Sequence, residues 1–152
     1  MVMTLEADYA VRIVDVLSQS AQRVDAHSIS DRTRVPLRFA LKILRKLVAS
    51  GIIVSYKGAH GGYTLARSAD RITLRQVIEA VEGPYMISRC QRTKYSCTHT
   101  ASCRFHEIYD EISVLVRKKL DSYTFASLGG MPESEKEGKP AEKSSEAPET
   151  KC

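Results

Sequence analysis

Long hydrophobic runs are missing from this sequence of 152 residues. A helix that crosses a bilayer needs about 20 predominantly apolar residues, and no stretch approaches that length. The start of the chain also lacks the apolar centre of a signal peptide, because charged residues interrupt the pattern at Glu6, Asp8, Arg12 and Asp15. These absences predict a cytoplasmic protein without a membrane partner.

Signatures of catalysis are absent as well. The chain has no glycine fingerprint for nucleotides and no combination of nucleophile and base. No segment repeats another. We therefore expect a binding protein and not an enzyme.

Large apolar side chains are almost missing from residues 131–152, "MPESEKEGKPAEKSSEAPETKC". Such a composition cannot bury enough surface to offset the entropy of ordering, which predicts a disordered tail. Residues 1–130 then hold 19 basic and 12 acidic residues, a net charge of +7 against +5 for the whole chain. A domain this basic favours a polyanionic partner such as nucleic acid, although a positive balance can also serve solubility alone.

Helical periodicity covers the first half of the chain. Thr4 is a suitable N-cap for an apolar pattern that begins at Leu5, and "SISD" over 28–31 resembles the start of a short helix that must end before Pro36. The clearest helix is "PLRFALKILRKLVASG" over 36–51, which Gly51 ends. Its apolar stripe runs along Leu37, Leu41, Leu44 and Val48 and is widened by Ala40, Ile43 and Leu47. Its other face carries Arg38, Lys42 and Arg45.

A hairpin and two further helices follow. "IIVSY", a glycine-rich loop "KGAHGG" and "YTL" predict a β-hairpin. "TLRQVIEAVEGP" opens on a capping box of Thr73 and Gln76 and ends at Gly83 and Pro84. A long helix is expected over 104–125, with apolar residues at 105, 109, 112, 116, 120 and 123.

This order of elements describes a winged helix-turn-helix, so the expected fold is mainly α with a small β-hairpin wing. A major groove admits one helix, whose outward side chains reach base edges and phosphates. The candidate DNA-binding residues are Arg34, Leu37, Arg38, Phe39, Lys42 and Arg45 around the second helix, and Lys57, His60 and Gly61 in the wing. The plainer alternative is that the basic face is only solvated and that "GAHGG" is only a turn.

Three cysteines and a histidine gather in "CQRTKYSCTHTASCRFH". Cys90, Cys97 and Cys103 are separated by six and five residues, and His106 follows after two more. Zinc sites generally pair their ligands through short C-x2–4-C steps, which are absent here. Disulfides are disfavoured by a reducing compartment and by the odd number of cysteines in this segment. Iron–sulfur clusters accept thiolates on longer loops and also a histidine, so the pattern favours a cluster.

Several of these segments together resemble the bacterial IscR/NsrR/CymR-type transcription regulators. They are "DYAVRIV", "RVPLRFALKILRKLVASGIIVSYKGAHGGYTLAR", "ITLRQVIEAVEG" and the cysteine triplet, and the likeness spans about residues 3–125. The resemblance implies a homodimer whose long C-terminal helices pack together. It also implies that two winged domains bind a pseudo-palindromic operator in double-stranded DNA. The implied organisation is a winged domain over 1–83, a cluster loop over 84–103, a dimerisation helix over 104–127 and a disordered tail over 128–152.

The same resemblance bears on the cofactor. Members that bind a cluster carry such a triplet before the dimer helix, although the first gap here is one residue longer than in the best-known members. His106 matches the fourth ligand of members with a [2Fe–2S] cluster. Asp8 matches the carboxylate that completes a [4Fe–4S] cluster from the other subunit in members that sense nitric oxide. Both residues are present, and we prefer His106 because its spacing to Cys103 is fixed.

The implied function is a DNA-binding transcription regulator whose operator binding is controlled by an iron–sulfur cluster, in response to redox state, nitric oxide or cluster status. The alternative is a cluster-free winged-helix repressor that responds to a protein partner, a small ligand or direct thiol oxidation. Both alternatives stay open on the sequence.

Overall fold

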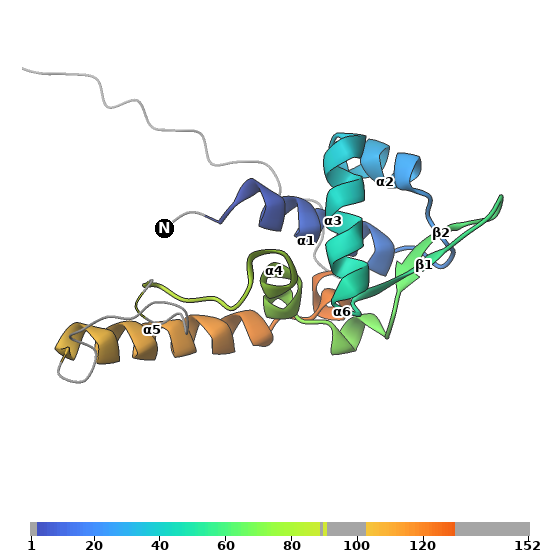
Figure 1. The fold of residues 1–152 in the computed structure, drawn as a ribbon. Coiled ribbons are helices and arrows are strands. Elements are labelled where there is room, and N and C mark those ends of the chain that lie inside the picture. Colours follow the sequence, from blue (N-terminus) through green and yellow to red (C-terminus); the bar gives the residue numbers. More distant parts are fainter. Residues whose placement is uncertain (1–2, 89, 91–102, 130–152) are drawn as a thin grey trace, which may run out of the picture.

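Helices and one small hairpin make up the computed structural model of the chain, which describes residues 3–88, 90 and 103–129 (Figure 1). The elements follow the order α1 (Leu5–Ser18), α2 (Ala26–Thr33), α3 (Leu37–Ala49), β1 (Ile53–Tyr56), β2 (Gly62–Leu65), the 3-10 turn η1 (Ala69–Arg71), α4 (Leu74–Glu82), α5 (Arg104–Asp121) and α6 (Phe125–Leu128). The expected fold class, mainly α with a hairpin wing and a long C-terminal helix, is confirmed. The disordered tail predicted over 128–152 begins too early, because Leu128 belongs to α6 and packs against the core. Residues 130–152 of that tail lie outside the described residues.

Local capping decides where the first two helices begin. Thr4 caps α1 as predicted, because its side chain accepts a hydrogen bond from the backbone N–H of Ala7. The start predicted for α2 at Ser28 was wrong by one turn. Asp25 is the N-cap, and its Oδ1 accepts from the N–H groups of His27 and Ser28 at 3.0 Å each. Ser28 instead donates its hydroxyl to Asp25, since a carboxylate is the stronger acceptor.

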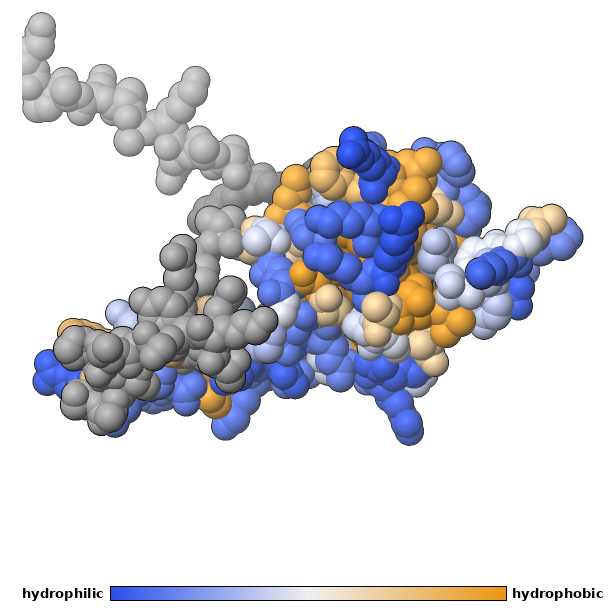
Figure 2. All heavy atoms as spheres, viewed as in Figure 1, coloured by the Kyte–Doolittle hydropathy of each residue, from blue (hydrophilic) through white to orange (hydrophobic). Residues whose placement is uncertain are grey.

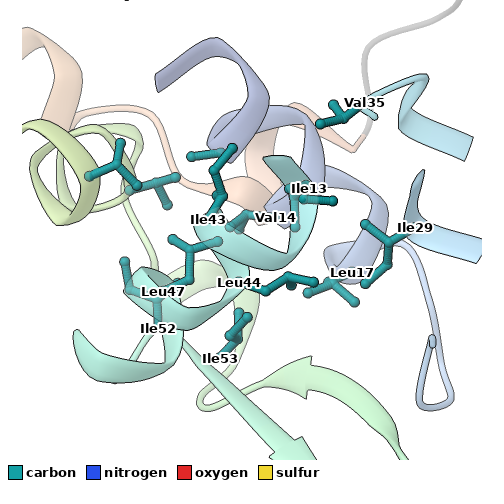
Figure 3. Packing of buried hydrophobic residues seen from close by; sticks show 14 of the residues in the cluster. Ile13, Val14, Leu17, Ile29, Val35, Ile43, Leu44, Leu47, Ile52 and Ile53 are labelled. Carbon is teal, nitrogen blue, oxygen red and sulfur yellow. The ribbon is translucent and has the colours of Figure 1, made fainter. Parts of the chain in front are cut away.

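The core lies where α1 packs against α2, α3 and α4 (Figure 3). The buried face of α3 is rotated toward the widened side of the predicted stripe, because Leu37, Leu41 and Val48 are only half-buried. Its fully buried residues are Ala40, Ile43, Leu44 and Leu47. The three basic residues at 38, 42 and 45 lie opposite the centre of this face, at 100° per residue.

The wing is an antiparallel hairpin in which Ile53 pairs with Leu65 and Tyr56 with Gly62. An isolated bridge between Val24 and Tyr63 joins the loop before α2 to this hairpin. A Cβ atom at Gly62 would lie 2.9 Å from the carbonyl oxygen of Val24, so the close approach of the two segments requires glycine there. The start of β2 is therefore held against the loop before α2.

The last helices agree with the prediction except at the C-terminal end of α5. The capping box of Thr73 and Gln76 opens α4 as predicted, but α5 ends at Asp121 and does not continue to 125. The backbone of Phe125 instead donates to Ile72 O at 3.1 Å, and its side chain is 1% exposed in the core. The chain therefore leaves the helix after Asp121, because residues 123–125 pair with the backbone before α4 and Phe125 is buried.

Helix α5 extends away from the winged part of the molecule (Figure 1). One of its faces lies against the segment after α4, where Ser113 is buried and accepts a hydrogen bond from the N–H of Ile87 at 3.1 Å. Another face presents apolar side chains to solvent at Phe105, Ile108, Ile112 and Leu115. Within the described residues, no helix is both long and apolar enough to span a bilayer.

Candidate nucleic-acid interface and cysteine site

The outward face of α3 is basic. Arg38, Lys42 and Arg45 are all exposed there, and hydrophilic side chains cover the front of this helix between hydrophobic regions (Figure 2). Arg38 and Arg45 take part in no ion pair with another described residue. Two guanidinium groups are thus available to an anion, and their spacing follows one side of the helix.

The other predicted residues of this region differ in exposure. Phe39 is 52% exposed and meets the ring of Tyr9 edge-on, with centroids 6.4 Å apart. Leu37 is half-buried, whereas Arg34 is exposed and ends α2 with a left-handed backbone at φ 55°. The turn between the two helices therefore presents one more basic side chain beside α3.

The tip of the wing carries its predicted residues outward. Lys57 and His60 are exposed, and Gly61 donates its N–H to the carbonyl of Gly58 at 2.9 Å. Arg23 was not among the residues predicted to belong to this region. Its guanidinium lies 3.8 Å from the ring centroid of Tyr56 in β1. This cation–π contact lies at the end of β1 that adjoins the wing tip. Its only signal in the sequence was a basic residue in the loop before the second helix.

Glu6 is a second residue that the sequence analysis missed. Its Oε1 lies 2.8 Å from the ammonium of Lys46 and 3.5 Å from that of Lys42, both on α3. The hydrogen bond from Lys46 holds the pKa of Glu6 below its ordinary value, against the opposing effect of burial. One carboxylate on α1 thus contacts a residue predicted to bind DNA.

Two of the predicted metal ligands are in contact. The Sγ of Cys90 lies 3.5 Å from Nδ1 of His106 and 3.2 Å from the hydroxyl of Ser88. Cys103 is the N-cap of α5, and its carbonyl accepts from the N–H of His106 at 3.0 Å. Cys97 lies outside the described residues, and no set of three or more potential ligands clusters among those that are described.

This donor set fits an iron–sulfur cluster in its chemistry. Such clusters take thiolates and, in some cases, imidazole as ligands. Cys90 follows α4, while Cys103 and His106 begin α5, so the described donors join the two ends of the segment between these helices. A group bound by them would tie this segment to the first turn of α5.

Asp8, the alternative fourth ligand, has a partner within its own helix. Its Oδ2 lies 2.8 Å from the guanidinium of Arg12, one turn later in α1. The carboxylate is about one-third exposed, at 33%. An i,i+4 pair of this kind stabilises a helix modestly, so Asp8 has a structural role whether or not it binds a metal.

Family comparison gives these features a context. Residues 3–130 match the Rrf2 family, described as "Iron-dependent Transcriptional regulator". The chain belongs to the Rrf2 family. This Rrf2 chain is 31% identical over 128 residues to an HTH-type transcriptional regulator of Neisseria meningitidis serogroup A, across 83% of the chain and 86% of the relative. It is also 31% identical to the HTH-type transcriptional regulator IscR of Sodalis glossinidius, across 83% of the chain and 77% of the relative.

Solved structures agree with the fold of this Rrf2 protein. CymR, the global cysteine regulator of B. subtilis, superposes with a TM-score of 0.68 at 23% identity, covering 85% of this chain and 96% of CymR. T. potens IscR gives a TM-score of 0.68 at 22% identity, covering 92% and 94%. The protein is a transcriptional regulator of the Rrf2 family, and the prediction that it is not an enzyme is confirmed by relatives named as regulators.

Proposed function

We propose that this Rrf2 regulator binds a pseudo-palindromic operator as a homodimer and that an iron–sulfur cluster controls the binding. The observation that carries the proposal is the 3.5 Å contact between Cys90 and His106, which brings together two predicted ligands that are 16 residues apart. The basic face of α3 supports the DNA-binding part. The exposed apolar face of α5 supports the dimer.

The DNA-binding part uses α3 and the wing. Arg38 and Lys42, near the N-terminal end of α3, reach base edges or phosphates in the major groove, and Arg45 reaches phosphate. Lys57, His60 and the backbone at Gly61 approach the duplex from the wing, where a side chain would obstruct the contact. Two copies related by a two-fold axis then meet two half-sites.

The cluster part uses Cys90, Cys97 and Cys103 as thiolate ligands, with His106 as the fourth. A bound iron–sulfur cluster supplies a redox-active centre that also reacts with nitric oxide. The protein residues join the segment after α4 to the start of α5, because they come from both. Loss of the cluster would remove this link between the segment after α4 and the start of α5. If the link is coupled to DNA binding by about 1–3 kcal/mol, its loss changes the DNA affinity about 5–150-fold.

Absorption and Mössbauer spectra of protein isolated without oxygen test the cluster. We expect a broad visible band and an iron signal that disappear in Cys90→Ser. Cys152→Ser is the matched control, because Cys152 lies in the tail outside the triplet. Colourless, iron-free wild-type protein that binds DNA as tightly as a reconstituted sample would contradict the proposal.

The fourth ligand needs its own pair of variants. His106→Ala should alter the Mössbauer spectrum, whereas Asp8→Ala should leave it unchanged. Arg12→Gln controls for the loss of the Asp8–Arg12 ion pair, which Asp8→Ala also removes. A spectrum changed by Asp8→Ala and not by Arg12→Gln or His106→Ala would assign the ligand to Asp8 and favour the [4Fe–4S] type.

Neutral variants of α3 test the interface. The probe is a duplex that the wild-type protein selects from a random pool. Arg38→Gln should cost about 1–3 kcal/mol if Arg38 reads a base. Lys42→Gln should lower the salt slope, by at most about 0.9 for one lost phosphate contact. Lys118→Gln, an exposed position on α5, is the control. Unchanged binding of both α3 variants would remove this helix from the interface.

The cluster-free alternative is also open to test. The Sγ of Cys90 lies beside the His106 ring and is part-buried, and direct oxidation of such a thiol would need no iron. In that case the protein isolated without oxygen is colourless, and DNA binding changes with thiol oxidants. The two mechanisms therefore differ in the visible spectrum before any DNA is added.

A further inference from the structure

Lys42 has a partner inside the protein that competes with DNA. Its ammonium lies 3.5 Å from Oε1 of Glu6. We propose that Glu6 is a positioning residue that holds Lys42 back from the duplex until a phosphate displaces it, and so sets the affinity and salt dependence of operator binding. This inference rests on the proposed function, in which Lys42 contacts DNA.

The two lysines that share Glu6 are not equivalent. Lys46 lies closer, at 2.8 Å from the same oxygen, and also donates to the carbonyl of Val81 at 3.0 Å. Its side chain is 36% exposed, whereas that of Lys42 is 61% exposed and makes the longer contact. When a phosphate attracts Lys42, Glu6 therefore keeps Lys46 as its counter-charge. Lys42 is the partner that can leave.

Glu6 itself is held in place. It belongs to the first turn of α1, whose N-cap Thr4 is hydrogen-bonded to Glu82 at the end of α4, through both its hydroxyl and its N–H. Oε1 of Glu6 is buried, and its contacts with the ammonium groups of Lys46 and Lys42 compensate its charge. The carboxylate cannot follow Lys42 toward a duplex without losing these contacts.

The surroundings of the pair strengthen the competition. Glu6 and Lys42 lie on the wall of a depression between α1 and α3 that Leu5, Tyr9 and Phe39 also line. Apolar walls reduce the water available to screen the two charges.

The test compares Glu6→Gln with Asp15→Asn on the selected duplex. Both variants remove one negative charge from α1, but Asp15 lies half a turn around the helix from Glu6 and forms no ion pair among the described residues. We expect Glu6→Gln to bind about 1.5–5-fold more tightly per half-site in about 50 mM salt. The gain should shrink toward one as the salt concentration rises, because screening weakens the Glu6–Lys42 pair.

A second variant identifies Lys42 as the mediator. In a Lys42→Gln background, Glu6→Gln should leave DNA affinity unchanged, because the lysine on which Glu6 acts is gone. Equal gains from Glu6→Gln and Asp15→Asn, or a gain that persists in the Lys42→Gln background, would overturn the proposal, since both would mean a general charge effect.

Further measurements separate a folding defect in a variant, a failure of the proposed DNA interface and a failure of the role given to Glu6. Glu6→Gln keeps an oxygen that can accept from Lys46, and its thermal midpoint checks the fold. Lys42→Gln alone gives an independent measurement, the ratio of wild-type to variant affinity at a series of salt concentrations. One unopposed phosphate contact would make this ratio fall with about the 0.9 power of the salt concentration. We expect a smaller exponent, because Glu6 opposes the contact. If Lys42→Gln has no effect at all, the proposed interface fails. If it weakens binding with the full slope, only the role of Glu6 fails.

Discussion

At the scale of single residues, Asp121 fastens the end of α5 to the winged domain. Its Oδ2 lies 2.7 Å from Nε of Arg75, and its Oδ1 accepts from the hydroxyl of Thr73 at 3.0 Å. The Arg75 hydrogen bond, with a smaller contribution from Thr73, holds the pKa of Asp121 below its ordinary value of 3.8 despite partial burial. The end of α5 is thus joined to the start of α4 by a contact whose strength depends on pH.

The sign of that dependence follows from the lowered pKa. The folded protein binds the Asp121 proton less tightly than the unfolded chain, so the stabilisation is present above the ordinary pKa and is lost as pH falls through the folded one. We expect Asp121→Asn to lower the free energy of unfolding at pH 7 by roughly 0.5–1 kcal/mol, because a side chain that is 38% exposed is screened by solvent. Its stability should also fall less than that of the wild type as the pH is lowered below about 4.

Urea denaturation at a series of pH values measures both effects. Asp31→Asn is the control, because Asp31 is exposed on α2 and has no ion pair with a described residue. If Asp121→Asn and the wild type lost stability in parallel on acidification, the contact with Arg75 would not be the source of the pH dependence.

Phe125 makes a different contribution, through packing. Although it follows the long helix in sequence, it is 1% exposed in the core of the winged domain. Phe125→Ala should lower the free energy of unfolding by about 3–5 kcal/mol, because it removes a buried ring. Phe105→Ala deletes the same atoms from a position that is 57% exposed and should cost much less in the monomer. Similar losses measured by chemical denaturation would contradict the assignment of Phe125 to the core.

At the scale of elements, the wing depends on a close backbone approach. A Cβ atom at Gly61 would lie 2.5 Å from the carbonyl oxygen of Tyr56 and 2.9 Å from that of Gly58. If the tip kept its present shape, the methyl group of Gly61→Ala would cost about 1–3 kcal/mol. We therefore expect the tip to change shape in this variant. Because the tip is exposed and outside the core, we expect weaker DNA binding with little change in the thermal midpoint.

Gly129→Ala is the control for this change. The methyl group that it adds would meet nothing nearer than 3.8 Å. Fluorescence anisotropy with the selected duplex compares the two variants. Equal affinities for Gly61→Ala and the wild type would show that the wing tip does not contact the duplex.

At the scale of the whole molecule, α5 has an apolar face that its own chain leaves exposed. Ile108, Ile112 and Leu115 are 44%, 36% and 59% exposed and follow one another at spacings of four and three. Such spacing forms a continuous seam along a helix, typical of helices that pack against a partner. The seam differs from the stripe predicted from sequence, because residues near 113, 116 and 120 are partly covered by the protein itself.

The double variant Ile112→Gln and Leu115→Gln tests this face. We expect it to shift the protein from dimer to monomer at micromolar concentration in sedimentation, and to weaken operator binding because two half-sites are no longer linked. Lys118→Gln introduces the same residue at a polar position of α5 and should leave the dimer intact. Wild-type protein that sediments as a monomer would contradict the proposal before any variant is made.

Features that depend on neighbours in the chain could be predicted from the order of residues. Thr4, the pair of Thr73 and Gln76, and Gly51 locate helix ends correctly, because capping and left-handed glycines act within a few residues. The same holds for the hairpin and for the basic face of α3. These local signals also carried the motifs that identify the family.

Only the tertiary structure decided the features that join distant residues. Local periodicity placed Phe125 in the last helix, but backbone pairing with Ile72 put it in the core. The contact between Glu6 and Lys42 has no signal in spacing, because it depends on how α1 packs against α3. The sequence grouped Cys90 with His106 as candidate ligands, but the 3.5 Å contact between them depends on how the segment after α4 meets α5. Side chains far apart in sequence meet only when burial of the core fixes the elements that carry them.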